Sequence, residues 1–299
     1  MTKKALVIGS EGNIGKPLVT YLKNLGYSVL RLDHRPGWGK DYFMADIRNA
    51  SDMLDVFDWK PDVVFHLAAM VSRVTCEQAS SLAVDVNLVG TQNVLNFTKR
   101  INAHLVYFST SEVYGPNIEV MSEEITPKPN NRYGLTKLLS ESLVEYEVQQ
   151  YGMSAVILRP FMMYDEEEDL GDHRSAMIRF ATNLFLGKTI EVHKGSARGW
   201  LHVSDAVKAI EAAAHLKEYS VINIGNPDIR PIEELAEMIR KAYGASDSLV
   251  QLIDLPNRMT LTKRPTLDRQ RDLLGIIPKI QLKEGVDLVC KKVKERISR

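Results

Sequence analysis

The fold is decided by the stretch Ala5-Leu6-Val7-Ile8-Gly9-Ser10-Glu11-Gly12-Asn13-Ile14-Gly15. The four apolar residues predict a buried strand, and the glycines that follow have the spacing of a turn leading into a helix. Gly9 allows a tight turn, Gly12 lets the backbone approach a pyrophosphate, and Gly15 lets the helix pack closely on the sheet. The helix N-terminus offers unpaired N–H groups to phosphates. The stretch therefore predicts a dinucleotide-binding strand, turn and helix.

Short apolar runs alternate with longer amphipathic segments through the first half of the chain. Strands are expected at Ala5–Ile8, Ser28–Leu32, Val63–Leu67, Leu105–Phe108 and Ala155–Leu158, and helices at Ile14–Leu25, Leu82–Arg100 and Tyr133–Gln150. Such alternation predicts an α/β, Rossmann-type fold with a doubly wound parallel sheet.

After Pro160 the pattern becomes less regular. Helices are expected at about His173–Leu186, Val203–Leu216, Ile232–Tyr243 and Lys283–Ile297, and short strands near Glu191–Val192 and Val221–Ile224. We expect residues 1–160 to form the dinucleotide-binding domain, to which residues of about 200–225 return. Residues 161–299 would form mainly a smaller, interleaved substrate-binding lobe. The acidic stretch Asp165–Asp169 is typical of a solvated loop.

A carboxylate at the end of the second expected strand favours NAD as the dinucleotide. Asp33 can accept hydrogen bonds from both ribose hydroxyls and would repel a 2′-phosphate. Arg31, His34 and Arg35 oppose this preference, since a cation beside the ribose could attract that phosphate. NAD is therefore expected, and NADP is the alternative.

A tyrosine and a lysine have the spacing of a proton-transferring pair. Tyr133 and Lys137 are four residues apart on an expected helix, so both side chains lie on one face. A nearby ammonium stabilises a phenolate, which a tyrosine needs in order to act as a base near neutrality. Thr110 follows an expected strand, where its hydroxyl would face the cofactor cleft and share the substrate proton.

These motifs together resemble the extended short-chain dehydrogenase/reductase superfamily, in particular its nucleotide-sugar epimerase/dehydratase branch. The resemblance covers nearly the whole chain and rests on Gly9/Gly12/Gly15, Asp33, Asp46-Ile47, His66-Leu67-Ala68-Ala69, Asn87, Gly90-Thr91, Ser109–Gly115, Tyr133/Lys137 and Leu158-Arg159-Pro160.

The resemblance implies an enzyme that oxidises a sugar C4 hydroxyl with NAD, giving a 4-keto intermediate. Thr110 would be the hydroxyl partner, Tyr133 the base and Lys137 the residue that orients the nicotinamide ribose. Asp46 and Ile47 would flank the adenine. The implied cofactor-binding residues are Gly9, Gly12, Asn13, Ile14, Gly15, Asp33, Asp46, Ile47, Leu67, Ala68, Ala69, Asn87, Tyr133, Lys137 and Pro160.

Glu112 points to chemistry beyond simple oxidation. Thr110-Ser111-Glu112 resembles the Thr-x-Glu of nucleotide-sugar 4,6-dehydratases and the Thr-Ser-Glu of UDP-glucuronate decarboxylases. Once C4 is oxidised, a nearby base can drive elimination or enolisation. The alternative is that Glu112 merely hydrogen-bonds the loop or faces solvent.

The substrate half departs from the family pattern at two positions. Met162 stands where family members usually carry a substrate-contacting Asn, and Asp165 stands where a glycine usually follows the tyrosine. The candidate substrate-binding residues are Ser111, Arg174, Arg198 and Arg264. Arg198 lies in a segment resembling the one whose arginine pairs with the nucleotide diphosphate, and a guanidinium fork suits phosphate oxygens. Arg174 and Arg264 could instead be surface arginines in salt bridges.

Composition excludes several other classes of function. The chain has 38 basic and 38 acidic residues, and its net charge of zero indicates no nucleic-acid partner and no attraction to a membrane surface. Cys76 and Cys290 form no CxxC pair, and the chain has no signal peptide or long apolar stretch, so a cytoplasmic protein is expected. No metal site is expected, because His66, His193 and His202 lie on apolar strands and are typical of packed histidines. Asp205 is expected to cap a helix.

The favoured partner is a nucleotide-diphosphate sugar. Two alternatives remain: a net NAD-dependent dehydrogenase or reductase of a sugar or another alcohol, and a non-catalytic NAD-sensing protein. The family resemblance also implies a homodimer, formed through the outer faces of Leu82–Arg100 and Tyr133–Gln150.

Overall fold

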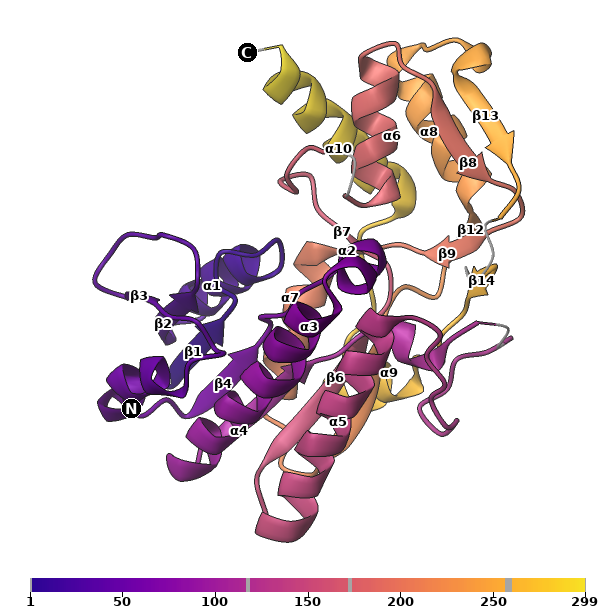
Figure 1. Cartoon of the computed structure of the whole chain (residues 1–299). Helices are drawn as coiled ribbons and strands as arrows, with labels where there is room; N and C mark the ends of the chain where they lie inside the picture. Colours follow the sequence, from indigo (N-terminus) through magenta and orange to yellow (C-terminus); the bar gives the residue numbers. More distant parts are fainter. Residues whose placement is uncertain (1, 117–118, 172–173, 256–259, 299) are drawn as a thin grey trace.

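The computed structural model describes residues 2–298 except 117–118, 172–173 and 256–259. Over these residues the main sheet has seven parallel strands in the order β11-β6-β5-β4-β1-β2-β3 (Figure 1). The strands are β1 Lys4–Ile8, β2 Ser28–Asp33, β3 Tyr42–Met44, β4 Val63–His66, β5 His104–Phe108, β6 Ala155–Pro160 and β11 Ser220–Ile224. The expected doubly wound sheet is confirmed, and β3 is a strand that the sequence did not predict.

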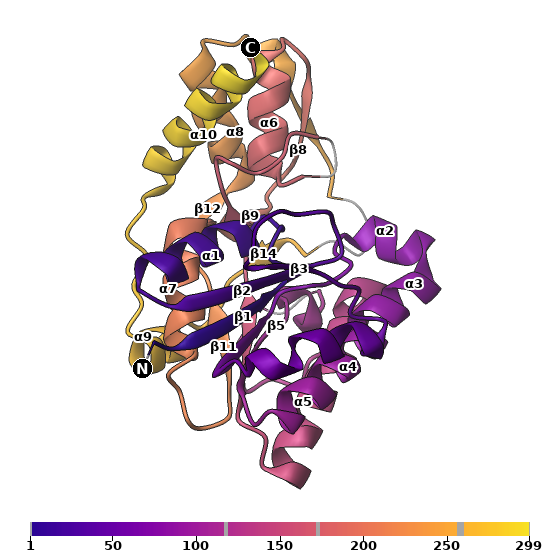
Figure 2. The same cartoon turned by 90° about the vertical axis from the view of Figure 1, so that its left-hand side faces the viewer.

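Helices cover both faces of this sheet, which explains why the strand β1 is apolar at consecutive positions. Its Ala5 and Val7 belong to the core under α1 (Gly15–Asn24) and α7 (Val203–Ala213). Its Leu6 and Ile8 belong to the core on the other face, under α4 (Gly90–Arg100) and α5 (Arg132–Tyr151). Figure 2 shows α1 and α7 on one side of the strands and α4 and α5 on the other. A parallel strand buried on both faces needs apolar residues at consecutive positions.

The expected helix Leu82–Arg100 is present but not uniform. It consists of α3 (Ser80–Val84), a π-helical turn η2 (Asp85–Val89) and α4, and the short helix α2 (Arg73–Gln78) precedes it. The expected helix Tyr133–Gln150 is confirmed as α5. The Asn131 side chain caps it by accepting a hydrogen bond from the Gly134 N–H.

A second core lies in the lobe that contains α6 (Ala176–Phe185), α8 (Ile232–Tyr243), α10 (Leu282–Ile297), β8 (Ile190–His193) and β13 (Val250–Ile253). The chain leaves this lobe to form α7 and β11 on the main sheet. It does so again at α9 (Asp268–Leu274), whose Leu274 joins the core under α1. The sequence predicted the return of α7 and β11 but not that of α9.

Short strands connect the two cores. β9 (Ala197–Gly199) lies between β12 (Ile229–Pro231) and β14 (Thr262–Lys263), and β7 (Met163–Tyr164) pairs with β10 (Leu201–His202). These strands are too short to be recognised by alternation of apolar residues, yet β14 and β7 both carry residues that line the cleft described below.

The acidic stretch Asp165–Asp169 is not a solvated loop, which corrects the sequence expectation. Asp165 and Glu168 are buried, each with 8% of its surface exposed. The Glu168 carboxylate accepts hydrogen bonds from the N–H and Oγ of Ser175, at the start of α6, at 3.0 and 2.8 Å. Glu166 Oε2 lies 2.8 Å from Nε2 of His202. These contacts attach the stretch to α6 and α7 and make it part of the cleft wall.

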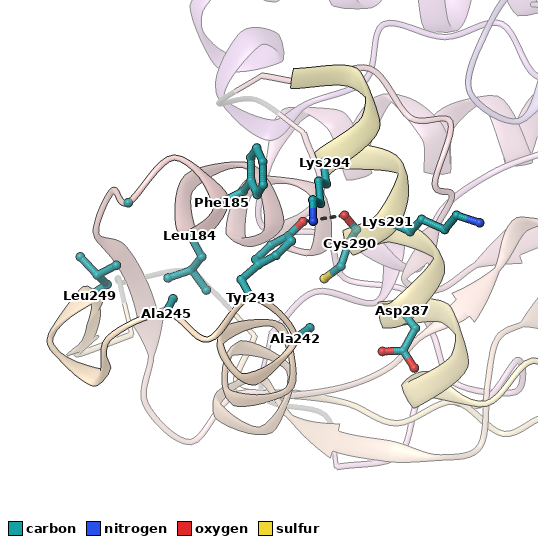
Figure 3. Close-up of a pocket in the computed structure, with 11 residues that line it drawn as sticks. Leu184, Phe185, Ala242, Tyr243, Ala245, Leu249, Asp287, Cys290, Lys291 and Lys294 are labelled. Atoms are coloured by element: carbon teal, nitrogen blue, oxygen red, sulfur yellow. Dashed lines mark hydrogen bonds between the residues drawn. The ribbon is translucent and has the colours of Figure 1, made fainter. Parts of the chain in front are cut away.

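A hollow of about 610 Å³ opens between α6, α8 and α10 (Figure 3). Its sides are mainly apolar, and the Tyr243 hydroxyl donates a hydrogen bond of 2.9 Å to the Cys290 carbonyl. None of the residues predicted for the site lines this hollow. Cys76 and Cys290 are both buried free thiols. Among the described helices, none is both long and apolar enough to cross a membrane.

Candidate active site

A cleft of about 880 Å³ lies outside the carboxyl ends of the main strands and extends to the second lobe. Carboxyl ends of parallel strands are where open α/β sheets bind ligands. The predicted cofactor residues that line this cleft are Gly9, Gly12, Asn13, Ile14, Gly15, Asp33, Asp46, Ile47, Leu67, Ala68, Ala69, Tyr133 and Pro160.

The glycine turn after β1 fits a dinucleotide pyrophosphate. Gly9 has a φ of +87°, and a Cβ there would lie 2.7 Å from the Ala68 nitrogen. A Cβ on Gly15 would lie 2.1 Å from the Gly9 carbonyl oxygen, so α1 can approach the turn only with glycine at this position. The turn therefore leaves backbone N–H groups at the helix start accessible to phosphate oxygens.

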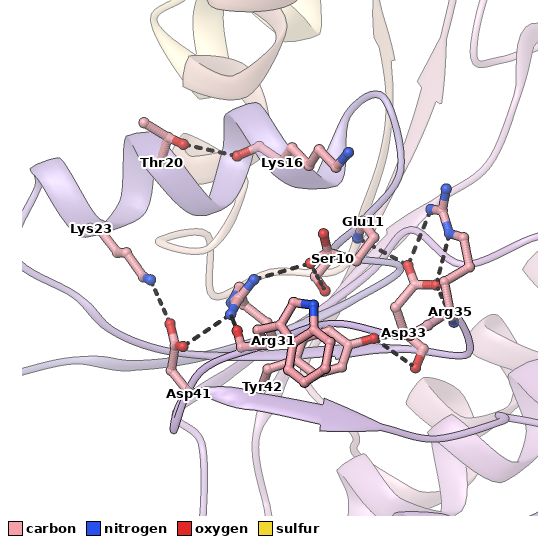
Figure 4. A network of polar contacts seen from close by, with 11 residues as sticks. Ser10, Glu11, Lys16, Thr20, Lys23, Arg31, Asp33, Arg35, Asp41 and Tyr42 are labelled. Atoms are coloured by element: carbon pink, nitrogen blue, oxygen red, sulfur yellow. Dashed lines mark hydrogen bonds and ion pairs between the residues drawn. The ribbon is translucent and has the colours of Figure 1, made fainter. Parts of the chain in front are cut away.

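Asp33 ends β2 and is 3% exposed. Its carboxylate accepts hydrogen bonds from the Glu11 N–H at 2.9 Å and from the Arg35 N–H at 3.1 Å (Figure 4). Burial alone would raise the pKa of this carboxyl, but these donors and the Arg35 guanidinium lower it below its ordinary value. Arg31 does not face the cleft; it pairs with Glu11 at 3.2 Å and Asp41 at 3.1 Å.

Asn87, which the resemblance implied as a cofactor ligand, has a different position. It is 1% exposed, and it does not line the cleft. Its Oδ1 accepts a hydrogen bond of 2.7 Å from the Met70 N–H, and its Nδ2 donates to the Met70 carbonyl and to Thr136 Oγ1. Since these bonds occupy the side chain, Asn87 holds the cleft segment that contains Met70 instead of touching the cofactor.

The predicted catalytic trio comes from β5 and α5. Thr110 lies two residues beyond β5 and lines the cleft together with Tyr133. A Cβ on Gly134 would lie 2.6 Å from the Glu112 carbonyl oxygen, so this glycine lets the start of α5 pack against the Thr110 segment. Lys137 follows one helical turn after Tyr133 and is 1% exposed, with Nζ 4.2 Å from the centre of the Tyr107 ring.

Burial controls the protonation of this pair. It raises the pKa of the Tyr133 phenol, and the neighbouring Thr110 hydroxyl lowers it only in part. Burial also lowers the pKa of the Lys137 ammonium to about 7. The sequence predicted a tyrosine pKa lowered by Lys137. In the structure the net direction is upward, because the loss of hydration outweighs the favourable contacts.

Glu112 lies in the cleft among cations. It forms an ion pair with Lys263, its Oε2 accepts a hydrogen bond of 2.8 Å from Asn131 Nδ2, and the same oxygen lies 3.6 Å from Arg73 Nε. Burial would raise the pKa of the Glu112 carboxyl, but these partners lower it below its ordinary value. Glu112 is therefore a carboxylate facing the cleft, not a loop residue in open solvent.

Sequence reasoning missed Lys263, Asn131 and Arg73. Lys263 is 8% exposed, and burial lowers the pKa of its ammonium while Glu112 opposes that shift. A signal for Asn131 was available, since an Asn just before an expected helix predicts an N-cap. No local pattern distinguishes Lys263 from its neighbour Arg264, because the strand β14 that carries Lys263 has only two residues.

Two of the predicted substrate arginines do not line the cleft. Arg264 is exposed. Arg198 is buried and directs its guanidinium to backbone carbonyls: Nη1 to Ala197 and Leu261, both at 2.7 Å, and Nη2 to Thr260 at 2.6 Å. These bonds fix the backbone just before the strand that carries Lys263, so Arg198 positions that strand and does not line the cleft itself. Burial lowers the pKa of Arg198 to about 10.

The other two predicted substrate residues do line the cleft. Arg174 pairs with Asp169 at 3.0 Å. Ser111 is 5% exposed, and its Oγ lies 3.4 Å from Lys263 Nζ. Ser111 and Arg174 therefore remain candidates for substrate contact, together with Lys263.

Asp165, Glu166 and His202 bring potential ligand atoms within 4.8 Å of one another. His202 Nδ1, however, accepts a hydrogen bond of 3.1 Å from the Ser204 N–H and caps α7. A neutral imidazole that accepts at Nδ1 carries its proton on Nε2, which faces Glu166. That nitrogen then has no lone pair for a metal. Asp205, expected as the cap, instead accepts hydrogen bonds from the N–H groups of residues 279 and 280.

Comparison with known proteins identifies the family of this chain. Residues 5–225 match the NAD dependent epimerase/dehydratase family. UDP-glucuronic acid decarboxylase 6 of Arabidopsis thaliana is 27% identical, over 96% of this chain and 87% of the relative. UDP-N-acetyl-alpha-D-glucosaminuronate decarboxylase of Bacillus cytotoxicus is 27% identical, over 96% of both chains.

Solved structures show the same fold over nearly the whole chain. UDP-glucose 4-epimerase of Thermotoga maritima superimposes with a TM-score of 0.92 at 23% identity, covering 98% of this chain and 99% of the other. MoeE5 in complex with UDP-glucose and NAD gives 0.87 at 25% identity, with the same coverage. The chain is thus a member of the NAD-dependent epimerase/dehydratase family, within the extended short-chain dehydrogenase/reductase superfamily, and its cofactor is NAD.

Proposed function

We propose that this enzyme oxidises the C4 hydroxyl of a nucleotide-diphosphate sugar to a 4-keto intermediate. The observation that carries the proposal is the placement of Thr110 and Tyr133 in one cleft with the glycine turn, with Lys137 one helical turn behind Tyr133. NAD, when bound, accepts the hydride from C4. The names of the relatives, which act on UDP-sugars, support the substrate class.

In this mechanism Tyr133 takes the hydroxyl proton, and Thr110 shares it by hydrogen bonding. Burial disfavours an isolated Tyr133 phenolate and an isolated Lys137 ammonium. Formed together, the two charges offset each other in a medium of low polarity. Tyr133 is therefore an effective base only while Lys137 keeps its proton.

Glu112 is proposed as the second acid/base group. Its lowered pKa keeps it ionised at neutral pH, so it can accept a proton from the carbon next to the new ketone. Dehydration would also need a proton donor for the leaving hydroxyl; the neighbouring residue Ser111 is not an acid, so this role would fall to the Lys263 ammonium, 3.4 Å from Ser111 Oγ.

Among the reactions open to the 4-keto intermediate, one observation favours decarboxylation of a hexuronate. Two cationic side chains, Lys263 and Arg73, line the cleft beside Glu112, and cations in this position suit a substrate carboxylate. In the 4-keto acid the C5–C6 bond breaks and its electrons move into the ketone as CO₂ leaves. A proton that Lys263 would deliver then adds to C5, and return of the hydride to C4 gives the pentose and regenerates NAD.

The test is a panel of UDP- and dTDP-linked hexoses and hexuronates incubated with catalytic amounts of NAD. Turnover of a hexuronate to a pentose product with CO₂ release is expected, and Tyr133→Phe should abolish turnover while NAD still binds. If no nucleotide sugar is converted, the substrate proposal fails. Stoichiometric NADH would indicate a net dehydrogenase, and NAD binding without turnover of any sugar would indicate a sensor.

We also propose a homodimer through the outer faces of α3, η2 and α5. Large apolar side chains are exposed there, at 40% for Leu82, 45% for Val89, 44% for Leu135, 42% for Leu139 and 54% for Tyr146. Apolar side chains that are adjacent on the outside of packed helices are typical of subunit interfaces. Leu139→Glu should convert a dimer to a monomer in light scattering, whereas a wild-type monomer would contradict the proposal. The cytoplasmic location stays a prediction.

A further inference from the structure

The hollow between α6, α8 and α10 has an aromatic and aliphatic wall of small-molecule size. Phe185 at the end of α6 and Tyr243 at the end of α8 line it, together with Leu184 and Leu249. The ring centres of Phe185 and Tyr243 are 5.3 Å apart, and the rings are tilted by 54°. The volume of about 610 Å³ lies within the range of about 300–1,000 Å³ that is usual for small-molecule sites. The hollow can therefore bury an apolar body of that size.

Hydrogen bonding and burial fix this wall. The Tyr243 hydroxyl donates to the Cys290 carbonyl at 2.9 Å, which holds the ring against α10. Leu184 and Cys290 are only 3% and 5% exposed, and burial raises the pKa of the Cys290 thiol to about 11, so it carries no charge near neutral pH. A preformed apolar wall costs a ligand little ordering entropy on binding.

An ammonium group lies at the rim of this wall. Lys294 follows Cys290 by four residues, so both side chains lie on the same face of α10. Figure 3 shows the Lys294 side chain directed toward the hydroxyl end of Tyr243. The structure gives this ammonium no ion pair with any of the described residues. It is therefore available to an anion whose apolar part occupies the hollow.

The other charges of the rim do not take this role. Asp287 binds Lys283 through both carboxylate oxygens at 2.6 Å, so it is already neutralised by a different lysine. Lys291 directly follows Cys290 and so lies about 100° farther around the helix. Figure 3 shows Lys291 extending away from Tyr243. Lys294 is thus distinguished from Lys291 by its direction.

We propose that this hollow is a second binding site, for an amphiphilic organic acid that packs its apolar body against Phe185 and Tyr243 and pairs its anionic group with Lys294. An apolar pocket with a charged group placed to orient the ligand is the pattern of small-molecule sites. The stem of a lysine can lie along apolar surface while its ammonium reaches an anion in water. The hollow shares no lining residue with the catalytic cleft, so the site goes beyond the proposed reaction and does not depend on it.

The experiment measures binding by calorimetry in the presence of excess NAD⁺ and UDP, which are meant to occupy the cleft. The probes are decanoate for a straight-chain body, anilinonaphthalene sulfonate for an aromatic body, and decanol as the uncharged control. At least one of the two acids should bind with one molecule per chain, and the one that binds identifies the kind of body. If decanoate binds, it should do so about fivefold or more tightly than decanol, the effect of a charge-assisted contact.

Two variants of α10 test the anionic contact. Lys294→Gln should weaken the acid about fivefold or more and leave decanol within about twofold. Lys291→Gln, the matched control, removes the same charge from the same rim and should leave the acid within about twofold of wild type. Both lysines are exposed, so both variants should fold.

A third variant tests the place of binding. Ala242 lines the hollow and is exposed, so Ala242→Trp should fill the hollow without disturbing the fold, which its melting temperature checks. It should abolish binding of the acid.

Five results would overturn the proposal. They are a wild type that binds neither acid, undiminished binding by Ala242→Trp, wild-type affinity in Lys294→Gln, and equal weakening by Lys291→Gln and Lys294→Gln, which would show general charge attraction. The fifth is self-association of the wild type that Ala242→Trp abolishes, since this would assign the hollow to a second copy of the chain.

Discussion

A buried ion pair joins the helix that carries Tyr133 to the main sheet, and removing its carboxylate should weaken the whole domain. Glu141 on α5 and Arg159 on β6 are each 5% exposed. Arg159 donates to Glu141 through Nη2 at 2.6 Å and Nε at 3.0 Å, and Ser109 Oγ donates to the same carboxylate at 2.5 Å. The change we propose is Glu141→Gln, which keeps the shape and removes the charge.

The size of the loss in unfolding free energy follows from leaving Arg159 charged without a counter-ion. Burial by itself would lower the pKa of Arg159, but Glu141 raises it above its ordinary value, so the guanidinium stays ionised. Two unit charges about 4 Å apart attract by about 4 kcal/mol at an effective dielectric constant of about 20. Breaking a buried pair by removing one partner costs about 3–5 kcal/mol in other proteins. We therefore expect Glu141→Gln to lower the free energy of unfolding by about 4 kcal/mol.

Urea denaturation followed by circular dichroism measures this loss, with Glu147→Gln as the matched control on the same helix. Glu147 is also 5% exposed, but its partner Lys99 has 35% of its side chain exposed at a distance of 2.7 Å. Lys99 regains water when its partner is neutralised, so the control should lose about 1 kcal/mol or less. A loss below about 1 kcal/mol for Glu141→Gln, or equal losses for both variants, would refute the reasoning.

Three further predictions concern the cofactor turn and the acidic stretch. Gly15→Ala should abolish measurable NAD binding in calorimetry, because its Cβ would lie 2.1 Å from a backbone oxygen, and binding within about threefold of wild type would contradict this. Arg31→Met should weaken the binding of NAD several-fold, because it leaves the Glu11 carboxylate without its cation beside the phosphate site. Adding Glu11→Gln to this variant should restore the affinity for NAD. A double variant that still binds NAD weakly would show that Arg31 acts by stabilising the loop. The hydrogen bond with His202 lowers the pKa of Glu166, whereas burial raises the pKa of the neighbouring Asp165 to about 6. The Glu166 shift contributes stability that is present above the ordinary pKa of a glutamate and is lost as the pH falls below it, while the Asp165 shift contributes stability that is lost as the pH rises through about 6. Thermal melts of Glu166→Gln should therefore show a weaker loss of stability on the acid side, and a wild-type profile would rule this out.

The main sheet was predictable because its strands obey local rules. β1, β4, β5 and β6 are apolar at consecutive positions and are separated by amphipathic helices, which is the pattern of a parallel sheet buried on both faces. Short strands such as β14 carry two residues each, too few for any period to appear. Their existence depends on partners far away in sequence.

The site was predictable where a motif lies in one segment and unpredictable where segments meet. The glycine turn, Thr110 and Tyr133 each belong to a contiguous pattern and line the cleft. Lys263 reaches Glu112 across 151 residues, and no local feature distinguishes it from Arg264. The acidic stretch was mistaken for a solvated loop because its compensating partners, among them His202 and Ser175, follow later in the chain.

The return of β11 to the edge of the main sheet limits how this protein can be divided or recombined. β11 pairs with β6 over five residues, and its Asn223 accepts a hydrogen bond of 2.7 Å from the Tyr114 hydroxyl next to the cleft. A fragment that stops at residue 160 would leave β6 as an edge strand with unpaired backbone N–H and C=O groups, which favours aggregation. A chimera that exchanges the second lobe between relatives must therefore keep β11, α7 and α9 with the parent sheet, and so needs several crossover points instead of one.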